Sequence, residues 1–156
     1  MSSTTVQSLS RATTATFEEL ALLFPEAELF PEQAAAPLDV AVSVDFRGPL
    51  AGRLVVRASR CILPAIAANM LGADESRQPA LQRDALGEVA NVICGHVVPL
   101  IAGTDAVVNL SAPKLLDEGC TLSRDEDEPA ARVEFGVEDG RVETRLYLFP
   151  ATAAAA

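Results

Sequence analysis

The residues best suited to chemistry lie in one apolar stretch between residues 81 and 102. A carboxylate, Glu88, and a carboxamide, Asn91, stand three residues apart, so on a helix they point the same way and can engage one partner together. A carboxamide both donates and accepts hydrogen bonds and can hold a water molecule in a chosen orientation. A carboxylate can bind a lysine or arginine of an incoming protein. The pair therefore suits a site that orients water beside a bound cationic group.

These two residues belong to a narrow polar stripe on an otherwise apolar helix. At about 100° per residue, the polar and glycine positions fall within one arc of roughly 100°: Asp84, Gly87, Glu88, Asn91 and Gly95. A glycine inside a helix costs about 1 kcal/mol relative to alanine, and it removes bulk that would hold a partner's backbone away. We predict that Gly87 and Gly95 border a partner-binding surface. The alternative is an exposed polar stripe whose glycines allow close helix packing.

Other chemistry has little support in the sequence. There is no phosphate-binding glycine-rich loop, dinucleotide fingerprint or histidine pair for zinc. The single histidine, His96, lies about 120° from the stripe and is expected to be a helix residue near a packed edge. The acidic residues 125–128 lack the glycine and ligand spacing of a calcium loop and are expected to be solvated. The three cysteines are odd in number and far apart, which predicts reduced, partly buried packing residues: Cys61, Cys94 and Cys120.

Length and charge limit the class of protein further. The 156 residues suit one domain over 1–156, and the 12 basic against 22 acidic residues give a net charge of −10. Nucleic acid and anionic membranes bind clustered basic residues, whereas Lys114 is the only lysine, so proteins or small molecules are the expected partners. No continuous apolar run is long enough to span a bilayer, and the N-terminus lacks the regions of a signal peptide. These features predict a cytoplasmic protein.

The first third of the chain predicts one helix and a long connection. Thr16 is a suitable N-cap with acids in the first turn, and apolar residues recur at helical spacing from there to Pro25. Earlier turns through Val6 and Leu9 also fit a helix. Residues 1–10 and 151–156 are predicted to be disordered. Residues 25–37, rich in proline and alanine, are predicted to form a connection.

The rest of the chain alternates between strands and helices. Residues 38–46 and 53–58 predict a hairpin, Ser59 a helix cap, and Gly72 the end of that helix. The striped helix follows, and Pro99 is expected to kink or end it. Strand patterns return at 106–110, 133–137 and 142–149, the last two joined by a turn at Asp139-Gly140. This order predicts an α+β fold, a mostly antiparallel sheet with two long helices packed on one face.

The spacing Asp84-x3-Glu88-x2-Asn91, followed by Pro113, resembles the active-site signature of the CheC/CheX chemotaxis phosphatases. Three further segments resemble the CheX type in the same order along the chain: the first hairpin at 46–52, the helix end at 67–72 and the turn at 111–113. The resemblance covers roughly residues 10–150. Its single Glu/Asn pair fits CheX rather than CheC, whose members usually carry two.

The resemblance implies a CheX-like fold and hydrolysis of the aspartyl phosphate on a CheY-like response-regulator receiver domain. By that resemblance, Asn91 would orient the attacking water and Glu88 would pair with the receiver's lysine near the phosphoryl group. Asp84 would border the docking surface. The Mg²⁺ would belong to the receiver, so the chain would need no metal of its own, and CheX-type proteins pair through their sheets into homodimers.

Two other functions remain compatible with the sequence. The same fold could dock on a receiver or motor component without hydrolysis, because motor-switch proteins that resemble this family use the fold for assembly. The intact Glu88/Asn91 pair favours the enzyme, since a purely structural relative need not keep both groups. The chain could also be an unrelated small α+β domain, in which case the four-part match is accidental.

Overall fold

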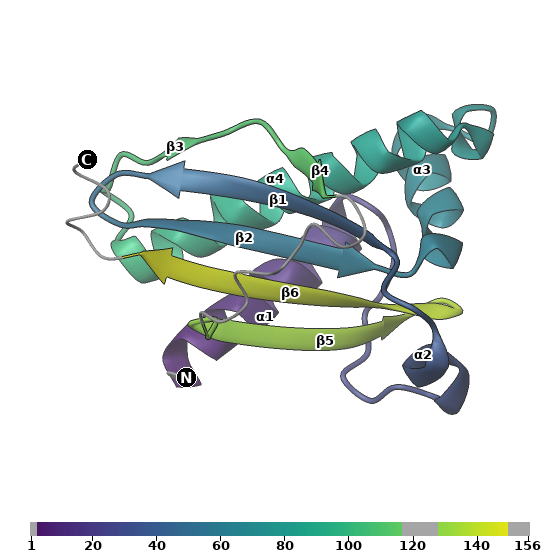
Figure 1. The fold of residues 1–156 in the computed structure, drawn as a ribbon, viewed down its shortest axis with the longest axis horizontal. Coiled ribbons are helices and arrows are strands. Elements are labelled where there is room, and N and C mark those ends of the chain that lie inside the picture. Colours follow the sequence, from purple (N-terminus) through teal and green to yellow (C-terminus); the bar gives the residue numbers. More distant parts are fainter. Residues whose placement is uncertain (1–2, 117–127, 150–156) are drawn as a thin grey trace.

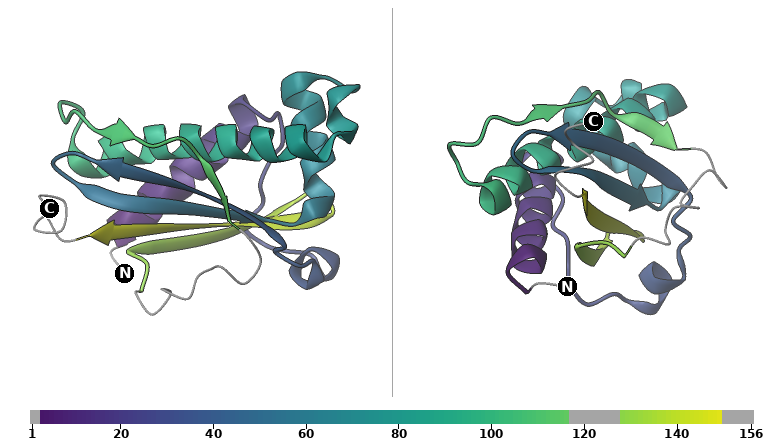
Figure 2. Two further views of the ribbon diagram at one scale, coloured as in Figure 1. Left: turned by 45° about the horizontal axis from the view of Figure 1, so that its top comes forward. Right: turned by 60° about the vertical axis from the view of Figure 1, so that its left-hand side comes forward.

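Antiparallel strands form one sheet, and two long helices cover one of its faces (Figures 1 and 2). The computed structural model describes residues 3–116 and 128–149. Within them the strand order is β3-β1-β2-β6-β5, with the short β4 also paired to β1. The strands are β1 (Val40–Arg47), β2 (Ala51–Ala58), β3 (Asn109–Leu110), β4 (Lys114–Leu116), β5 (Ala131–Val137) and β6 (Gly140–Phe149). The predicted α+β fold is confirmed.

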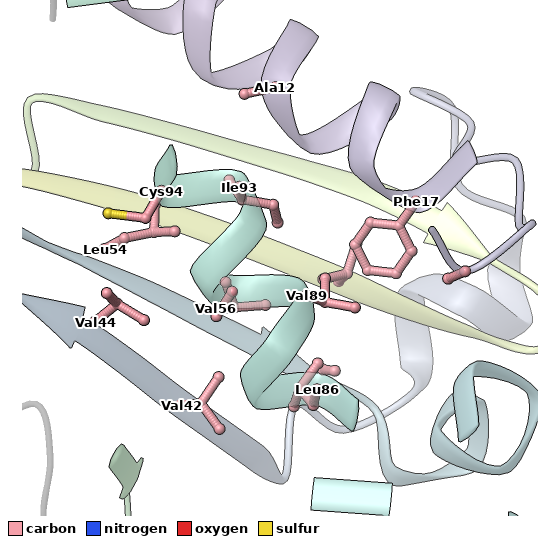
Figure 3. Close-up of a cluster of buried hydrophobic side chains, with 14 of the residues drawn as sticks. Ala12, Phe17, Val42, Val44, Leu54, Val56, Leu86, Val89, Ile93 and Cys94 are labelled. Atoms are coloured by element: carbon pink, nitrogen blue, oxygen red, sulfur yellow. The ribbon is translucent and has the colours of Figure 1, made fainter. Parts of the chain in front are cut away.

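The first hairpin forms because its strands alternate between a core face and an outer face. Val42 and Val44 of β1 are buried toward the helices, opposite Val56 and Leu54 of β2. Figure 3 shows these three valines and Leu54 on the strands beside the helix that carries the polar stripe. The sheet thus supplies a continuous apolar floor on which that helix lies.

The second hairpin differs by one residue from its predicted turn. Val137 pairs with Gly140, so the two turn residues are Glu138 and Asp139 rather than Asp139 and Gly140. Glu138 takes the positive φ of the turn, 49°. Gly140 is needed for a close approach instead, because a Cβ there would lie 2.7 Å from the Cβ of Ser59.

The first helix corrects two predictions. Helix α1 runs over Ser3–Glu19, so Thr16 lies in its last turn and does not cap its start. The Thr16 hydroxyl donates a 2.7 Å hydrogen bond to the carbonyl of Ala12, inside the helix. Residues 3–10 are helical rather than disordered, because Leu9 is fully buried against the sheet side of the molecule. Residues 151–156 lie outside the described residues.

Short elements join the first helix to the sheet and the sheet to the second long helix. They are α2 (Pro31–Ala35), inside the predicted connection, then the 3₁₀ turn η1 (Arg60–Ile62), α3 (Leu63–Leu71) and the 3₁₀ turn η2 (Glu75–Arg77). Helix α3 ends before Gly72, as predicted, and Gly72 has a positive φ of 118°. Ser59 was predicted to cap this helix, but its Oγ instead accepts a hydrogen bond from the backbone N–H of Arg141.

The striped helix, α4 (Pro79–Ala102), is continuous through Pro99. Only one turn follows this proline, and the Gly103 N–H still donates a hydrogen bond to the Pro99 carbonyl at 3.0 Å. The proline therefore costs the helix little stability. By length and composition α4 could cross a membrane. However, Leu86, Val89 and Ile93 are fully buried against the sheet, the arrangement of a core helix in a soluble fold.

The sheet face opposite the helices carries an ion-pair network centred on Glu143 of β6. This carboxylate is about 1% exposed and contacts three arginines, at 2.6 Å to Arg132, 2.9 Å to Arg145 and 3.3 Å to Arg57. Arg132 and Arg145 extend from neighbouring positions of β5 and β6. One buried acid therefore links the side chains of three adjacent strands, β2, β6 and β5.

We expect Glu143→Gln to lower the free energy of unfolding by about 2–3 kcal/mol. The neutral amide would leave three guanidinium groups without their shared counter-ion, although these groups reach solvent and are less costly than fully buried charges. Urea unfolding followed by circular dichroism measures the change. Glu134→Gln is the control, because Glu134 pairs with Arg132 and Arg141 but is 23% exposed. An equal loss in both variants would contradict a network centred on Glu143.

The same network predicts acid sensitivity. Burial alone would raise the pKa of Glu143, but the charges and hydrogen bonds of Arg145 and Arg132 outweigh it and lower this pKa below the ordinary value of a glutamate. Such a carboxylate contributes stability that is complete above its unfolded pKa and is lost as the pH falls through the folded pKa. The stability difference between wild type and Glu143→Gln should therefore stay constant between about pH 6 and 8 and shrink below about pH 4.5. Urea unfolding across this range tests it, and an undiminished difference near pH 3 would contradict it.

Candidate active site

The polar stripe of α4 lies on the side of the helix that the sheet does not cover. Asp84 and Glu88 are exposed, Asn91 is half-buried, and Gly95 is exposed. Their orientation follows from the buried side of the same helix, because residues that pack on the sheet fix the rotation of α4 about its axis. The predicted arc is therefore present as one surface, with the exception of Gly87, which is buried.

The two groups proposed for chemistry are not engaged by the rest of the chain. Within residues 3–116 and 128–149, neither Glu88 nor Asn91 makes a hydrogen bond or ion pair through its side chain. Buried or half-buried polar side chains in proteins are usually hydrogen-bonded, so a half-buried carboxamide without a partner has its donors and acceptor available. The geometry leaves Asn91 free to bind water and Glu88 free to bind a cation.

Gly87 has a reason inside the chain for being a glycine. A Cβ at this position would lie 3.2 Å from the Cβ of Pro113, tighter than ordinary van der Waals contact. Two hydrogen bonds between Ser111 and Asp45 of β1 hold Pro113 in this position. The Ser111 N–H donates to the Asp45 carbonyl at 2.8 Å, and the Asp45 N–H donates to the Ser111 hydroxyl at 2.9 Å. Gly87 thus lets the turn between β3 and β4 rest on α4. This contact, rather than an open surface, accounts for Gly87.

Gly95 is different, because a Cβ there would have no neighbour within 4 Å. No described part of the chain needs the space that this glycine leaves. A glycine in the helix interior nevertheless lowers helix stability. The side of α4 at Gly95, one turn beyond Asn91, is therefore open within the described residues.

A hollow of about 490 Å³ opens beside Glu88. Five of its lining residues recur at helical spacing on the N-terminal half of α4, and three come from β1, the turn and β4. They are Ala80, Arg83, Asp84, Gly87, Glu88, Val42, Pro113 and Leu115. The sequence pointed to Asp84, Gly87, Glu88 and Pro113 but not to Arg83 or Leu115. Leu115 was missed because the three residues of β4 are too few to show a periodic pattern.

The histidine and the cysteines form no further site among the described residues. His96 is exposed, with its Nδ1 atom 3.4 Å from the Thr16 hydroxyl of α1. Cys94 is buried, as predicted, and burial raises the pKa of its thiol to about 12, whereas Cys61 is exposed. Cys120 and residues 125–127 are not described. Among the described residues, no three His, Cys, Asp or Glu side chains gather into a potential metal site.

Comparison with known proteins identifies the family. The sequence model of the family described as "Chemotaxis phosphatase CheX" matches residues 40–135, more than half of the chain. The chain belongs to the CheX family. The matched residues of this CheX-family chain include the first hairpin, the whole of α4 and the Gly87–Pro113 contact. No protein of curated function is detectably similar to it in sequence.

Solved structures show the same fold. The CheX of Desulfovibrio desulfuricans is 18% identical, with a TM-score of 0.69 over 93% of this chain and 99% of that one. A putative chemotaxis protein of Desulfovibrio vulgaris Hildenborough is also 18% identical, with a TM-score of 0.70 over 93% and 96%. A chain of the CheX–CheY–BeF₃–Mg²⁺ complex of Borrelia burgdorferi is 16% identical, with a TM-score of 0.64 over 93% and 97%. At these identities the likeness establishes the CheX-like fold alone.

Replacing the two glycines of the stripe by alanine should change stability by different amounts. Gly95→Ala should raise the free energy of unfolding by about 1 kcal/mol, because alanine favours the helix and its methyl group meets open space. Gly87→Ala is the matched variant and should gain less or lose stability, because its methyl group must displace Pro113. Urea unfolding of the two proteins measures both changes. Equal stabilisation would mean that Pro113 yields freely and that the contact does not hold the turn.

Proposed function

We propose that this CheX-family chain hydrolyses the aspartyl phosphate of a CheY-like response-regulator receiver domain. One observation carries the proposal: Glu88 and Asn91 share an uncovered face of α4 and have no side-chain partner within the described residues. The family, described as a chemotaxis phosphatase, supports the reaction class. The Borrelia burgdorferi complex, which contains CheX, CheY, BeF₃ and Mg²⁺, supports the kind of partner.

In this proposal Asn91 orients the attacking water. Its amide oxygen accepts a hydrogen bond from the water, which turns an oxygen lone pair toward the phosphorus. The water oxygen forms a bond to phosphorus as the bond between phosphorus and the receiver's aspartate oxygen breaks. Inorganic phosphate leaves, the receiver regains its free carboxylate, and one water proton passes to solvent or phosphate. Positioning contributes most in such reactions, because phosphoryl transfer requires little covalent chemistry from the protein.

Glu88 has the second role, docking. Its carboxylate pairs with the receiver's lysine near the phosphoryl group, and this charge-assisted contact sets the distance between Asn91 and the phosphorus. Mg²⁺ is expected on the receiver and would neutralise phosphoryl charge there. Asp84 borders the docking surface one turn before Glu88, and open space at Gly95 admits the receiver's backbone beyond Asn91.

We further propose a homodimer in the cytoplasm. Strand β5 ends the sheet on one side, and within the described residues its outer edge pairs only with Glu26, at Gly136. Most of that edge is therefore available for strand pairing with a second copy. Size-exclusion chromatography with light scattering tests the dimer, and a monomer at micromolar concentration would contradict it.

We expect Asn91→Ala to lower the rate of phosphate release by about 10²-fold or more with little loss of receiver binding. The variant removes the group that orients water but leaves the docking carboxylate in place. The measurement is phosphate release from a panel of Mg²⁺-loaded, phosphorylated receiver domains, with wild type and variant side by side. Equal acceleration by both proteins would show that Asn91 takes no part in the reaction. Binding of one receiver without acceleration by wild type would favour the non-catalytic docking module.

Glu88→Ala should weaken receiver binding and lower the rate of phosphate release together. The receiver lysine loses its partner, and the phosphorus is no longer held at its distance from Asn91. The same assay gives kcat and KM, and calorimetry with the receiver gives Kd. Glu138→Gln is the control, since Glu138 is an exposed acid on the β5–β6 turn, outside the stripe. A loss of affinity in both variants would point to general electrostatics instead of a specific contact.

A further inference from the structure

The hollow beside Glu88 has an apolar floor next to a charged rim. Val42, Ala80, Pro113 and Leu115 supply its carbon surface, while Arg83, Asp84 and Glu88 supply its charges. The site chemistry described above uses Glu88 at its edge but leaves the apolar part unassigned. A hollow that joins apolar walls to a few placed charges is the usual form of a recognition pocket.

Leu115 is exposed there for a reason of register. It pairs with Val42 across the β1–β4 ladder, so both side chains project to the helix-bearing face of the sheet. Helix α4 covers Val42, which is 2% exposed, but leaves Leu115 on the edge strand 47% exposed. The sheet therefore extends its apolar face past the helix, directly beside the polar stripe.

Two features indicate which partner this surface fits. Glu88 lines both the hollow and the stripe, so a protein whose lysine binds Glu88 must also lie over the apolar floor. Asp84 stands four residues before Glu88, about 6 Å along the helix axis, and faces the same hollow. Within the described residues it has no ion-pair partner, so the rim presents two carboxylates to a basic surface.

We propose that the hollow receives an apolar side chain of the docked receiver domain, carried next to its phosphoryl-site lysine, and that Leu115 is its main specificity-determining contact. This inference rests on the proposed function, because it names how the same partner is held. The apolar side chain enters between Ala80, Pro113 and Leu115, and a second basic group of the receiver faces Asp84. The contact is made equally before and during the reaction, so it acts on docking and not on the chemical step.

We expect Leu115→Ser to raise KM for the phosphorylated receiver about tenfold and to leave kcat within about twofold of wild type, because loss of one half-buried apolar contact removes uniform binding. Ala80→Phe is a second variant that fills the hollow from the helix side and should raise KM as well. Leu100→Ser is the matched control, since Leu100 is 48% exposed on α4 but lies outside the hollow. Circular dichroism confirms that each variant is folded.

Calorimetry with receiver domains loaded with Mg²⁺ and BeF₃⁻ separates this inference from the phosphatase itself. Weaker binding of Leu115→Ser and Ala80→Phe, with Leu100→Ser unchanged, supports the apolar contact in the hollow even if wild type hydrolyses nothing. If wild type is active and both hollow variants have normal KM and Kd, the apolar contact in the hollow is overturned and the proposed phosphatase activity is retained. A fall in kcat without a change in KM also overturns that contact. Failure of wild type to bind any receiver overturns both proposals.

Discussion

The burial of one side of α4 on the sheet is the constraint from which the rest of this structure follows. Leu86, Val89 and Ile93 are fully buried, and any rotation of the helix would expose them and bury the charged stripe. Exposure of such side chains costs about 1.5–3 kcal/mol each, so the rotation is firmly set. The position of Glu88 and Asn91 on an open surface is therefore a consequence of core packing. Their geometry needs no loop and no hydrogen bond of their own.

The two glycines of the stripe show how similar sequence features can have different physical causes. Gly87 makes room for Pro113, which is part of the same chain, whereas the space at Gly95 is filled by nothing that the structure describes. In the sequence alone, both glycines are simply small residues at helical spacing, and their different causes cannot be told apart. The distinction needs the position of the turn at residues 111–113, which depends on the pairing of Ser111 with Asp45 in β1. Gly87 therefore shapes the site indirectly, while Gly95 leaves it accessible.

Much of the fold could be predicted from local patterns, and the exceptions have a common reason. Alternation identified β1, and helical periodicity identified the stripe, because each pattern repeats over many residues. The start of α1 was misjudged because Val6 and Leu9 give its polar first turns only a weak helical pattern, and the burial of Leu9 that orders them is a tertiary contact. The role of Leu115 was missed because β4 has only three residues. The site could be predicted where it lies on one helix, and not where a distant edge strand completes it.

The charge of the site narrows the form in which a phosphoryl group could arrive. Among the described residues, the hollow and stripe present Asp84 and Glu88 but only one lining cation, Arg83. Free phosphate or a simple phosphate ester would meet net repulsion there, and the chain's net charge of −10 adds to it. A phosphoryl group bound to a protein that supplies its own lysine and Mg²⁺ carries the missing counter-charge. On our proposal, the acidity of this surface therefore selects against small phosphate esters and in favour of a phosphorylated protein that brings its cations with it.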